Sequence, residues 1–488
     1  MNGPAPSAEL GLNAFEHLMW ADDRLSTPMT FYLRLEFAGT LDQAKFRAAI
    51  AASLHRHPLL QSVAIGDPKL SGKKLRWQRT SDQPYVDWVE DGRSFKTPGR
   101  AVGIDLSREI GCRFFVRVDG EKTLVLAQFH HSSVDAKGGS LFLEDALAHY
   151  HASSENEDPH RYWRKLAAES LAERDQFHLS KKDLRRRRRL DWERIRMYFR
   201  LRPEIMWHAK QPADARANLA RSYDIEIDAA EFEQLKNYSK SRGCTINDVL
   251  LRDLFLTLNK WNDRHVKKRG SRCIRLAMAI DMRRPGDETM PAANVVSMCF
   301  LDRRPQDMSD REALLDDVRN ETRHIKRHYL GMALIRAARI FSSLRGGFAI
   351  LMRPNKLFPC HSTAVLSNLG LPLAHSNLPK RNDGFIVGDT KLIGFSLLPP
   401  FRVNTPLAVG VGTVGNKLRV AMHYNADVLT ADQMRTLGEL MRAELDTTLS
   451  YRAPEKTLIP MSPKPANGGP LWALPIGKNV APRAPDQA

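Results

Sequence analysis

Cysteine is scarce in this chain of 488 residues, which contains five. Their number is odd, their spacing is wide and no two form a Cys-x-x-Cys pair, so neither a disulfide framework nor a zinc site is predicted. We expect the thiols to serve as small apolar side chains of the core, and no metal site is predicted. The five residues are Cys112, Cys244, Cys273, Cys299 and Cys360.

Long apolar runs are absent as well. No stretch approaches the roughly 18–20 apolar residues that a membrane-spanning helix needs. The segment from Met1 to Pro6 lacks the basic and then apolar layout of a secretory signal. We therefore expect a cytoplasmic protein, with peripheral contact at the inner membrane as an open alternative.

Negative charge falls short of positive charge. The chain holds 74 Lys and Arg against 56 Asp and Glu, a net charge of +18. This balance favours an anionic partner, such as nucleic acid, a membrane surface, a phosphorylated cofactor or an acidic protein. No zinc-finger spacing, aromatic RNA-binding signature or basic helix-turn-helix pattern is present, so a nucleic-acid partner is not predicted.

The hydrophobic pattern predicts an α/β protein of more than one domain, since the length exceeds what one core usually supports. Alternating apolar residues at 31–37 indicate a strand, and apolar residues at helical spacing follow at 46–54. Later strands are predicted at 222–227, 274–280, 364–366, 392–398, 407–413 and 418–424, and a last helix at 431–449. The predicted divisions are an N-terminal domain at 1–180, a basic linker at 181–216, a C-terminal domain at 217–458 and a flexible Pro-rich tail at 459–488.

The linker region has a composition of its own. Residues 181–210 hold 12 Lys and Arg against four Asp and Glu, including the unbroken run Arg185 to Arg189, with apolar residues interleaved. A solvated basic linker is one interpretation. A basic amphipathic helix at a membrane surface is another, and contact with an acidic partner or nucleic acid is a third.

Two adjacent histidines follow a predicted hairpin. Strand-like runs at 113–118 and 123–129 are separated by Asp119-Gly120, a strong turn signal. The second strand leads into the run from His130 to Asp135, which reads His-His-Ser-Ser-Val-Asp, and a helical pattern follows. The pair therefore lies at a strand end, where a rigid element can place a reactive side chain on an accessible loop.

Histidine in such a place suits acyl transfer from a thioester. A base must take the proton of the acceptor as the acceptor attacks the carbonyl, and imidazole titrates near neutral pH. The thioester is already activated, so neither a metal nor a covalent serine is required. One histidine and a donor for the developing oxyanion can suffice.

Four further segments accompany the motif in order. They are Arg56-His57-Pro58-Leu59-Leu60, the Thr-Ile-Asn-Asp-Val-Leu-Leu run at 245–251, Asp281-Met282-Arg283-Arg284 followed by Asn294, and Ser367-Asn368-Leu369-Gly370. With these segments the sequence resembles, over about residues 10–455, the chloramphenicol acetyltransferase-like superfamily. That superfamily includes nonribosomal peptide condensation domains, alcohol acyltransferases and wax ester synthases/diacylglycerol acyltransferases. Its signature is His-His-x-x-x-Asp-Gly between a strand and a helix.

The resemblance implies two chloramphenicol acetyltransferase-like domains, each an α/β two-layer sandwich, in a pseudo-twofold V with an active-site channel between them. It makes His131 the general base. It assigns supporting roles to further residues: His130 and Asp135 structure the loop, Arg283 or Arg284 pairs with Asp135, and Ser367 and Asn368 line the channel. The implied donor is a thioester of coenzyme A, or of phosphopantetheine on an acidic acyl carrier protein. The implied acceptor is a small-molecule or lipid alcohol or amine.

One position departs from the signature, because the glycine after the aspartate is Ala136 here. If that glycine supplies a positive φ or a close backbone approach, alanine would be strained, unless Gly138-Gly139 moves the flexible point along the loop. The plant-type Asp-Phe-Gly-Trp-Gly motif is also absent. We favour a stand-alone coenzyme A-dependent acyltransferase. A carrier-protein-dependent condensation partner acting in trans, a lipid-forming enzyme at a membrane and a non-catalytic scaffold with this fold stay open.

Overall fold

The computed structural model describes residues 10–70, 72–90, 103–176, 181–208, 220–267, 269, 272–348, 359–373, 376–381 and 384–451. All of these belong to one compact unit, Met1–Tyr451. The tail predicted at 459–488 and the end of the predicted linker, 209–216, lie outside the described residues.

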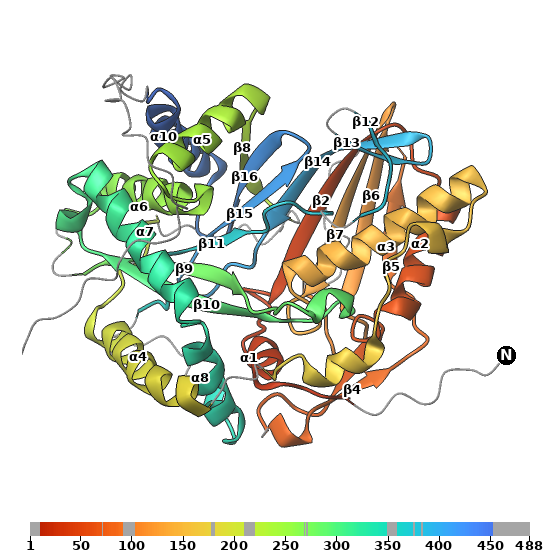
Figure 1. Cartoon of the computed structure of the whole chain (residues 1–488), viewed down its shortest axis with the longest axis horizontal. Coiled ribbons are helices and arrows are strands. Elements are labelled where there is room, and N and C mark those ends of the chain that lie inside the picture. The colour runs from red at the N-terminus through yellow and green to blue at the C-terminus, as the bar shows by residue number, and fades with distance from the viewer. Residues whose placement is uncertain are drawn as a thin grey trace, which may run out of the picture. The chain divides into compact units, whose positions relative to one another are not determined.

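A seven-stranded sheet with two helices on one face forms what we call the first lobe (Figure 1). Its order is β12-β13-β14-β2-β7-β6-β5, and β5 and β6 are its parallel pair. Apolar side chains of α2 and α3 join those of the strands in one core. The bounds are β2 Thr30–Ala38, α2 Gln43–Arg56, β5 Tyr85–Val89, β6 Cys112–Asp119, β7 Lys122–His130, α3 Ala136–Glu155, β12 Lys380–Arg381, β13 Gly384–Val387 and β14 Thr390–Leu398.

The first lobe confirms the elements predicted for the N-terminal part. The alternating apolar side chains of β2 are buried in the core, as the pattern at 31–37 predicted. The predicted hairpin is β6 and β7, which pair antiparallel through the turn at Gly120, whose φ is +55°. This hairpin delivers the double histidine to the end of β7.

A six-stranded sheet and its helices form the second lobe. Its order is β10-β9-β11-β15-β16-β8. Apolar side chains of α5, α6, α7 and α10 share a core with these strands. The bounds are β8 Ser222–Ile227, α5 Ala229–Ser241, α6 Ile246–His265, β9 Ile274–Asp281, β10 Val296–Arg303, α7 Arg311–Arg327, β11 Ala364–Asn368, β15 Leu407–Val414, β16 Lys417–Tyr424 and α10 Ala431–Leu449.

The strand predicted at 392–398 belongs to the first lobe, not to the second, and this corrects the assignment made from the sequence. As β14 it pairs antiparallel with β2, with Leu397 opposite Leu33, and it inserts between β13 and β2. The chain thus crosses from the second lobe into the sheet of the first and returns in β15. Hydrophobic alternation predicts that a segment is a strand but not which edge it joins. The predicted domain boundaries stay a prediction.

A smaller sheet and the helices α1, α4 and α8 lie beside the lobes. The sheet has the order β1-β4-β3, and α1 precedes β2. Residues 181–200 of the predicted linker form the helix α4, and α8 lies next to it (Figure 1). The bounds are β1 Leu10–Gly11, α1 Ala14–Ala21, β3 Ser62–Ile65, β4 Arg76–Arg79, α4 Lys181–Arg200 and α8 Met332–Ser342.

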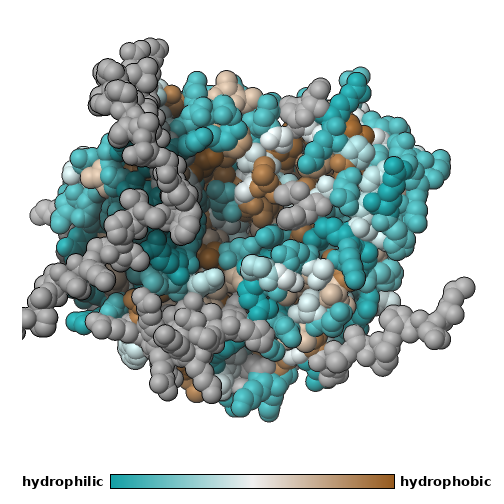
Figure 2. Space-filling view, viewed as in Figure 1, coloured by the Kyte–Doolittle hydropathy of each residue, from teal (hydrophilic) through white to brown (hydrophobic). Residues whose placement is uncertain are grey.

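Burial follows the usual division between apolar and polar side chains. In Figure 2, polar side chains cover most of the helices, and apolar ones gather near the middle of the face, in the region of β11, β14 and β15. All five cysteines lie in the described part of the chain, where no disulfide joins them; four are buried and Cys244 is partly exposed. Among the described helices, none combines the length and the apolar character that crossing a membrane requires.

Candidate active site

The loop from His130 to Asp135 connects β7 to α3 at the end of the first-lobe sheet. Asp135 is the N-cap of α3, and its Oδ1 accepts a hydrogen bond from the backbone N–H of Gly138 at 2.8 Å. Capping by a carboxylate fixes the first turn of the helix and therefore the end of the loop. The other end is fixed because the His131 N–H donates to the carbonyl of Met29 at 2.8 Å.

Asp135 also fastens this loop to the second lobe. Arg283, in the connection between β9 and β10, donates from Nη1 to Oδ2 at 2.8 Å and from Nη2 to Oδ1 at 3.0 Å. The N–H of Val295 adds a third donor to Oδ2 at 2.7 Å. Burial alone would lower the pKa of the Arg283 guanidinium, but the carboxylates of Asp135 and Asp281 outweigh it and raise that pKa. The pair is thus charged and bidentate, the strong form of this interaction.

Arg284, the other arginine proposed as partner of Asp135, has a different contact. Its Nη2 donates to Oδ1 of Asp287 at 3.2 Å, and its backbone N–H donates to Oδ2 of the same residue at 2.8 Å. These contacts close a local turn in the β9–β10 connection. Of the two candidates, the structure brings Arg283 to Asp135.

The imidazole of His131 is partly exposed and stands edge-on to the ring of Phe31, with 5.3 Å between centroids. Its Nδ1 is buried and makes no hydrogen bond of normal geometry with any described residue, which leaves Nε2 as the nitrogen open to a ligand. Desolvation by burial lowers the pKa of His131. Its own carbonyl and Asp135 oppose that shift, while His130 and Arg402 add to it. The ring is therefore neutral at neutral pH, the state that a general base requires.

The backbone of His131 is held from the second lobe. Nδ2 of Asn294 donates to the His131 carbonyl at 2.5 Å. The sequence placed Asn294 in a family-like segment but gave it no role. A second contact lies on the same connection, where the N–H of Ala292 donates to Nδ1 of His57 at 2.9 Å. On its other side, Nε2 of His57 lies 3.2 Å from Oδ2 of Asp145 in α3. Together with the contacts of Arg283 and Val295 to Asp135, these hydrogen bonds tie the β9–β10 connection to the first lobe.

His130 has no exposed surface. Its Nδ1 accepts from the N–H of Ser132 at 3.1 Å, and its Nε2 lies 3.6 Å from Oδ2 of Asp23. Burial alone would raise the pKa of Asp23, but His130 and the N–H of Met29 lower it. A side chain enclosed in this way can shape the loop but cannot reach a substrate.

Ala136 begins α3 and is not at a positive φ, so the strain that its substitution for glycine suggested is absent. The glycine that this loop needs is Gly138. A Cβ there would lie 2.5 Å from Cγ2 of Val134 and 2.8 Å from the carbonyl oxygen of Ala293. The close approach of the second-lobe backbone therefore falls two residues after the position of the family glycine.

Ser367 and Asn368 end β11, which runs parallel to β9. Because parallel strands end at one edge, both residues lie at the edge of the sheet from which the β9–β10 connection starts. Oδ1 of Asn368 accepts from the N–H of Gly370 at 2.9 Å, which closes a turn. Within the described ranges no hydrogen bond joins Ser367 or Asn368 to the loop 130–135. That they line a channel stays a prediction.

Arg402 escaped the sequence analysis. It pairs with Asp22 at the end of α1, and its charge lowers the pKa of His131. No local signal marks it, because an arginine in a loop after a strand is common and its neighbours are distant in sequence. Among the described residues, no group of three or more His, Cys, Asp or Glu side chains is arranged to hold a metal ion.

Comparison with known proteins identifies the fold. No family model and no curated protein matches the sequence. The first condensation domain of the calcium-dependent antibiotic synthetase, bound to a substrate analogue, superposes with a TM-score of 0.60 at 14% identity over 91% of this chain and 97% of that one. The epimerization domain of the third module of tyrocidine synthetase B gives 0.60 at 14% identity over 92% and 97%.

A third structure is the starter condensation domain of rhizomide synthetase in complex with C8-CoA, with a TM-score of 0.58 at 14% identity over 91% of this chain and 94% of that one. These matches cover both lobes. The chain therefore has the two-lobed fold of condensation and epimerization domains.

Proposed function

We propose that this protein is an acyltransferase in which His131 is the general base. The observation that carries the proposal is the double anchoring of the histidine loop, through Asp135 to Arg283 and through the His131 carbonyl to Asn294. This anchoring presents a neutral, partly exposed imidazole beside the β9–β10 connection of the second lobe. A base held in one orientation in this way can act on a bound acceptor.

The proposed reaction has two proton transfers. Nε2 of His131 takes the proton of an acceptor hydroxyl or amine as its oxygen or nitrogen attacks the thioester carbonyl. The carbon–sulfur bond then breaks, the acyl group remains on the acceptor, and the thiolate receives the proton from the imidazolium. No redox step occurs and no metal takes part, and the base is restored at the end of each turnover.

The donor we favour is an acyl thioester of coenzyme A. The net charge of +18 suits an anionic donor. The rhizomide synthetase domain was captured with C8-CoA, so the fold can accommodate such a molecule. Phosphopantetheine on an acidic carrier protein offers the same thioester, and a condensation partner acting in trans is the second candidate, because condensation domains share this fold. The cytoplasmic location predicted from the sequence suits both donors.

Thiol release tests the proposal. Wild-type protein is incubated with acyl-coenzyme A donors, or with carrier-bound acyl groups, and a panel of alcohols and amines. His131→Ala should slow release by about 100-fold or more, the contribution typical of a general base. The matched control is His55→Ala, since His55 lies exposed on α2.

Two outcomes contradict the proposal in different ways. Equal release by wild type and His131→Ala would remove His131 from the chemistry. Wild-type protein that releases no thiol from any donor would favour the non-catalytic scaffold.

A further inference from the structure

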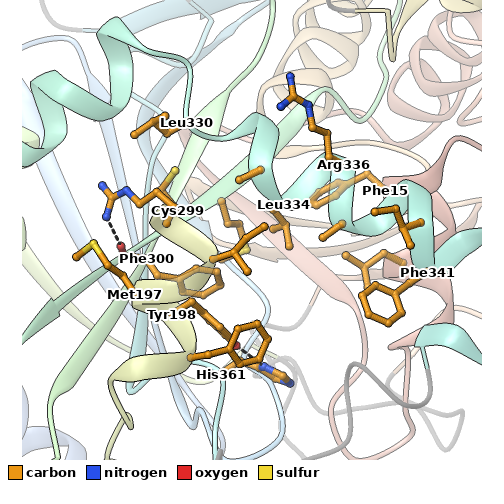
Figure 3. A pocket seen from close by; sticks show the side chains of 18 of the residues that line it. Phe15, Met197, Tyr198, Cys299, Phe300, Leu330, Leu334, Arg336, Phe341 and His361 are labelled. Atoms are coloured by element: carbon orange, nitrogen blue, oxygen red, sulfur yellow. Dashed lines mark hydrogen bonds between the residues drawn. The ribbon is translucent and has the colours of Figure 1, made fainter. Parts of the chain in front are cut away.

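A cavity of about 940 Å³ lies among α1, α4, α8 and β10 (Figure 3). None of its lining residues belongs to 130–135. Helix α4 contributes Trp192 and Ile195, α8 contributes Leu334 and Ile340, and β10 contributes Phe300. Its volume is in the range of small-molecule sites, roughly 300–1,000 Å³.

Most of the lining residues are apolar, and part of the lining is open to solvent. Trp192 is 71% exposed, Phe199 55% and Ile340 64%, and all three line the cavity. Large apolar side chains gathered in one exposed hollow mark a binding surface more often than a packing fault. Figure 3 shows Phe300, Leu334 and Phe341 around the hollow.

Both helices are held in place, so the cavity is preformed. At the end of α4, Nη2 of Arg275 donates to the carbonyl of Tyr198 at 2.9 Å, and the guanidinium lies 4.2 Å from the centre of the Tyr198 ring. The two ends of α8 are pinned as well. Oγ of Ser297 donates to the Gly331 carbonyl at 2.6 Å, and Oγ of Ser342 lies 2.9 Å from Nδ1 of His17.

Arginine side chains lie among the apolar residues of the lining. The lining arginines are Arg194, Arg336, Arg339 and Arg402, and the one acidic lining residue, Asp302, is paired with Arg275. Three of the arginines also have carboxylate partners outside the lining: Arg194 pairs with Glu321, Arg339 with Asp175 and Arg402 with Asp22. The sequence of α4 adds the run Arg185 to Arg189 to the same helix. A ligand that matches both features has an apolar chain and an anionic head.

We propose that this cavity binds the alkyl chain of an anionic amphiphile, with the head group among the surrounding arginines and α4 as the outer wall. Acyl thioesters of coenzyme A and anionic membrane lipids both carry this chemistry. The proposal concerns the binding of a ligand and not the proton transfer at His131, so the inference goes beyond acyl transfer and does not depend on it.

Chain length gives the sharpest test. Octanoyl-, decanoyl- and dodecanoyl-coenzyme A are titrated into the full chain by calorimetry, with coenzyme A alone and dodecanol as probes of the head and of the chain. Burial of each added methylene should lower Kd by up to about fourfold. A Kd that is the same for all three thioesters would overturn the proposal.

Variants locate the site. Ala337→Phe places a ring in the cavity and should weaken dodecanoyl-coenzyme A at least tenfold, whereas Ala443→Phe, at an exposed position of α10, should not. Ile340→Gln is the second variant, because its side chain is largely exposed and the change should leave the fold intact. Binding that is unchanged in both cavity variants, or that disappears in His131→Ala, would overturn the proposal.

Two measurements distinguish a soluble amphiphile from a membrane lipid. Binding of monomeric dodecanoyl-coenzyme A that phosphatidylglycerol vesicles do not displace points to a soluble ligand. Co-sedimentation with phosphatidylglycerol but not phosphatidylcholine vesicles, weakened in Ala337→Phe, points to a membrane lipid. Either result supports the site. A third outcome would contradict the proposed ligand site. In that outcome Ala337→Phe leaves co-sedimentation unaltered and the binding of the thioesters does not depend on chain length, so the vesicles bind an electrostatic surface.

Discussion

Arg283 and Asp135 are 148 residues apart in the sequence and form a buried ion pair through two hydrogen bonds. One residue belongs to the second lobe and the other caps the helix that follows the histidine loop. The pair therefore determines how the loop of the first lobe lies against the second lobe. Any change to it should act on stability and on the presentation of His131 together.

Removing the arginine should be costly. In Arg283→Ala the Asp135 carboxylate stays buried without its cation, and we expect the free energy of unfolding to fall by about 3–5 kcal/mol. Urea unfolding measures this loss, and thiol release should fall with it. Arg283→Lys keeps the charge but loses the two-point geometry, so its loss should be intermediate.

The neighbouring arginine is the control for that experiment. Arg284 pairs with Asp287 and its side chain is 30% exposed, so Arg284→Ala should cost about 1 kcal/mol or less. Equal losses in Arg283→Ala and Arg284→Ala would show that the contact with Asp135 has no special weight.

Activity should fall on the acid side. Burial depresses the pKa of His131 below its ordinary value of 6.5, so protonation removes the base only when the pH falls below that value. We expect kcat/KM to be constant from neutral pH down to about 6.5 and to decline as the pH falls further. A pH–rate profile of thiol release measures this. A decline that begins above pH 7 would mean that the titrating base is not a desolvated histidine.

The same ring responds to Arg402. Its positive charge disfavours the imidazolium, so Arg402→Gln should raise the pKa of His131 and move the acid limb to higher pH. Arg24→Gln is the matched control, since Arg24 approaches the same Asp22 carboxylate at 3.7 Å and is not among the groups that shift His131. If the pH–rate profiles of Arg402→Gln and Arg24→Gln decline over the same acid range, Arg402 does not shift the pKa of His131.

Much of the fold follows from local patterns in the sequence. Alternation predicted β2, the hairpin and most strands of the second sheet, and the last helix runs over Ala431–Leu449 as expected. The destination of β14 was not predictable, because Leu397 and Leu33 meet only through a pairing that no single-chain period encodes. Sequence periodicity specifies which face of a strand is buried, whereas the strands it pairs with depend on tertiary contacts.

The candidate site shows the same division. The double histidine was visible as a motif, and Arg283 was one of two candidate partners of Asp135. Which arginine pairs with Asp135 depends on the turn in which Arg284 bonds to Asp287, and no sequence motif indicates that turn. Arg402 and the cavity beside α4 gave no signal, since each is assembled from segments far apart in the chain. Apolar residues of α4 were noted, but their common hollow with α8 exists only in three dimensions.

The glycine requirement in the histidine loop leads to a last prediction. A Cβ at Gly138 would meet Val134 and the Ala293 carbonyl at 2.5 and 2.8 Å, whereas one at Gly139 would lie 3.3 Å or more from its neighbours. Gly138→Ala should therefore lower the free energy of unfolding by about 1–3 kcal/mol and slow thiol release, and Gly139→Ala should do less.

Ala136→Gly, which restores the family signature, should leave the rate of thiol release within about twofold, because Ala136 is not at a positive φ, and should weaken α3 only by a glycine's lower helix propensity, about 1 kcal/mol or less. Thermal unfolding and thiol release on these three variants decide the matter. A gain in rate of tenfold or more in Ala136→Gly would show that the substituted position, and not Gly138, limits the loop.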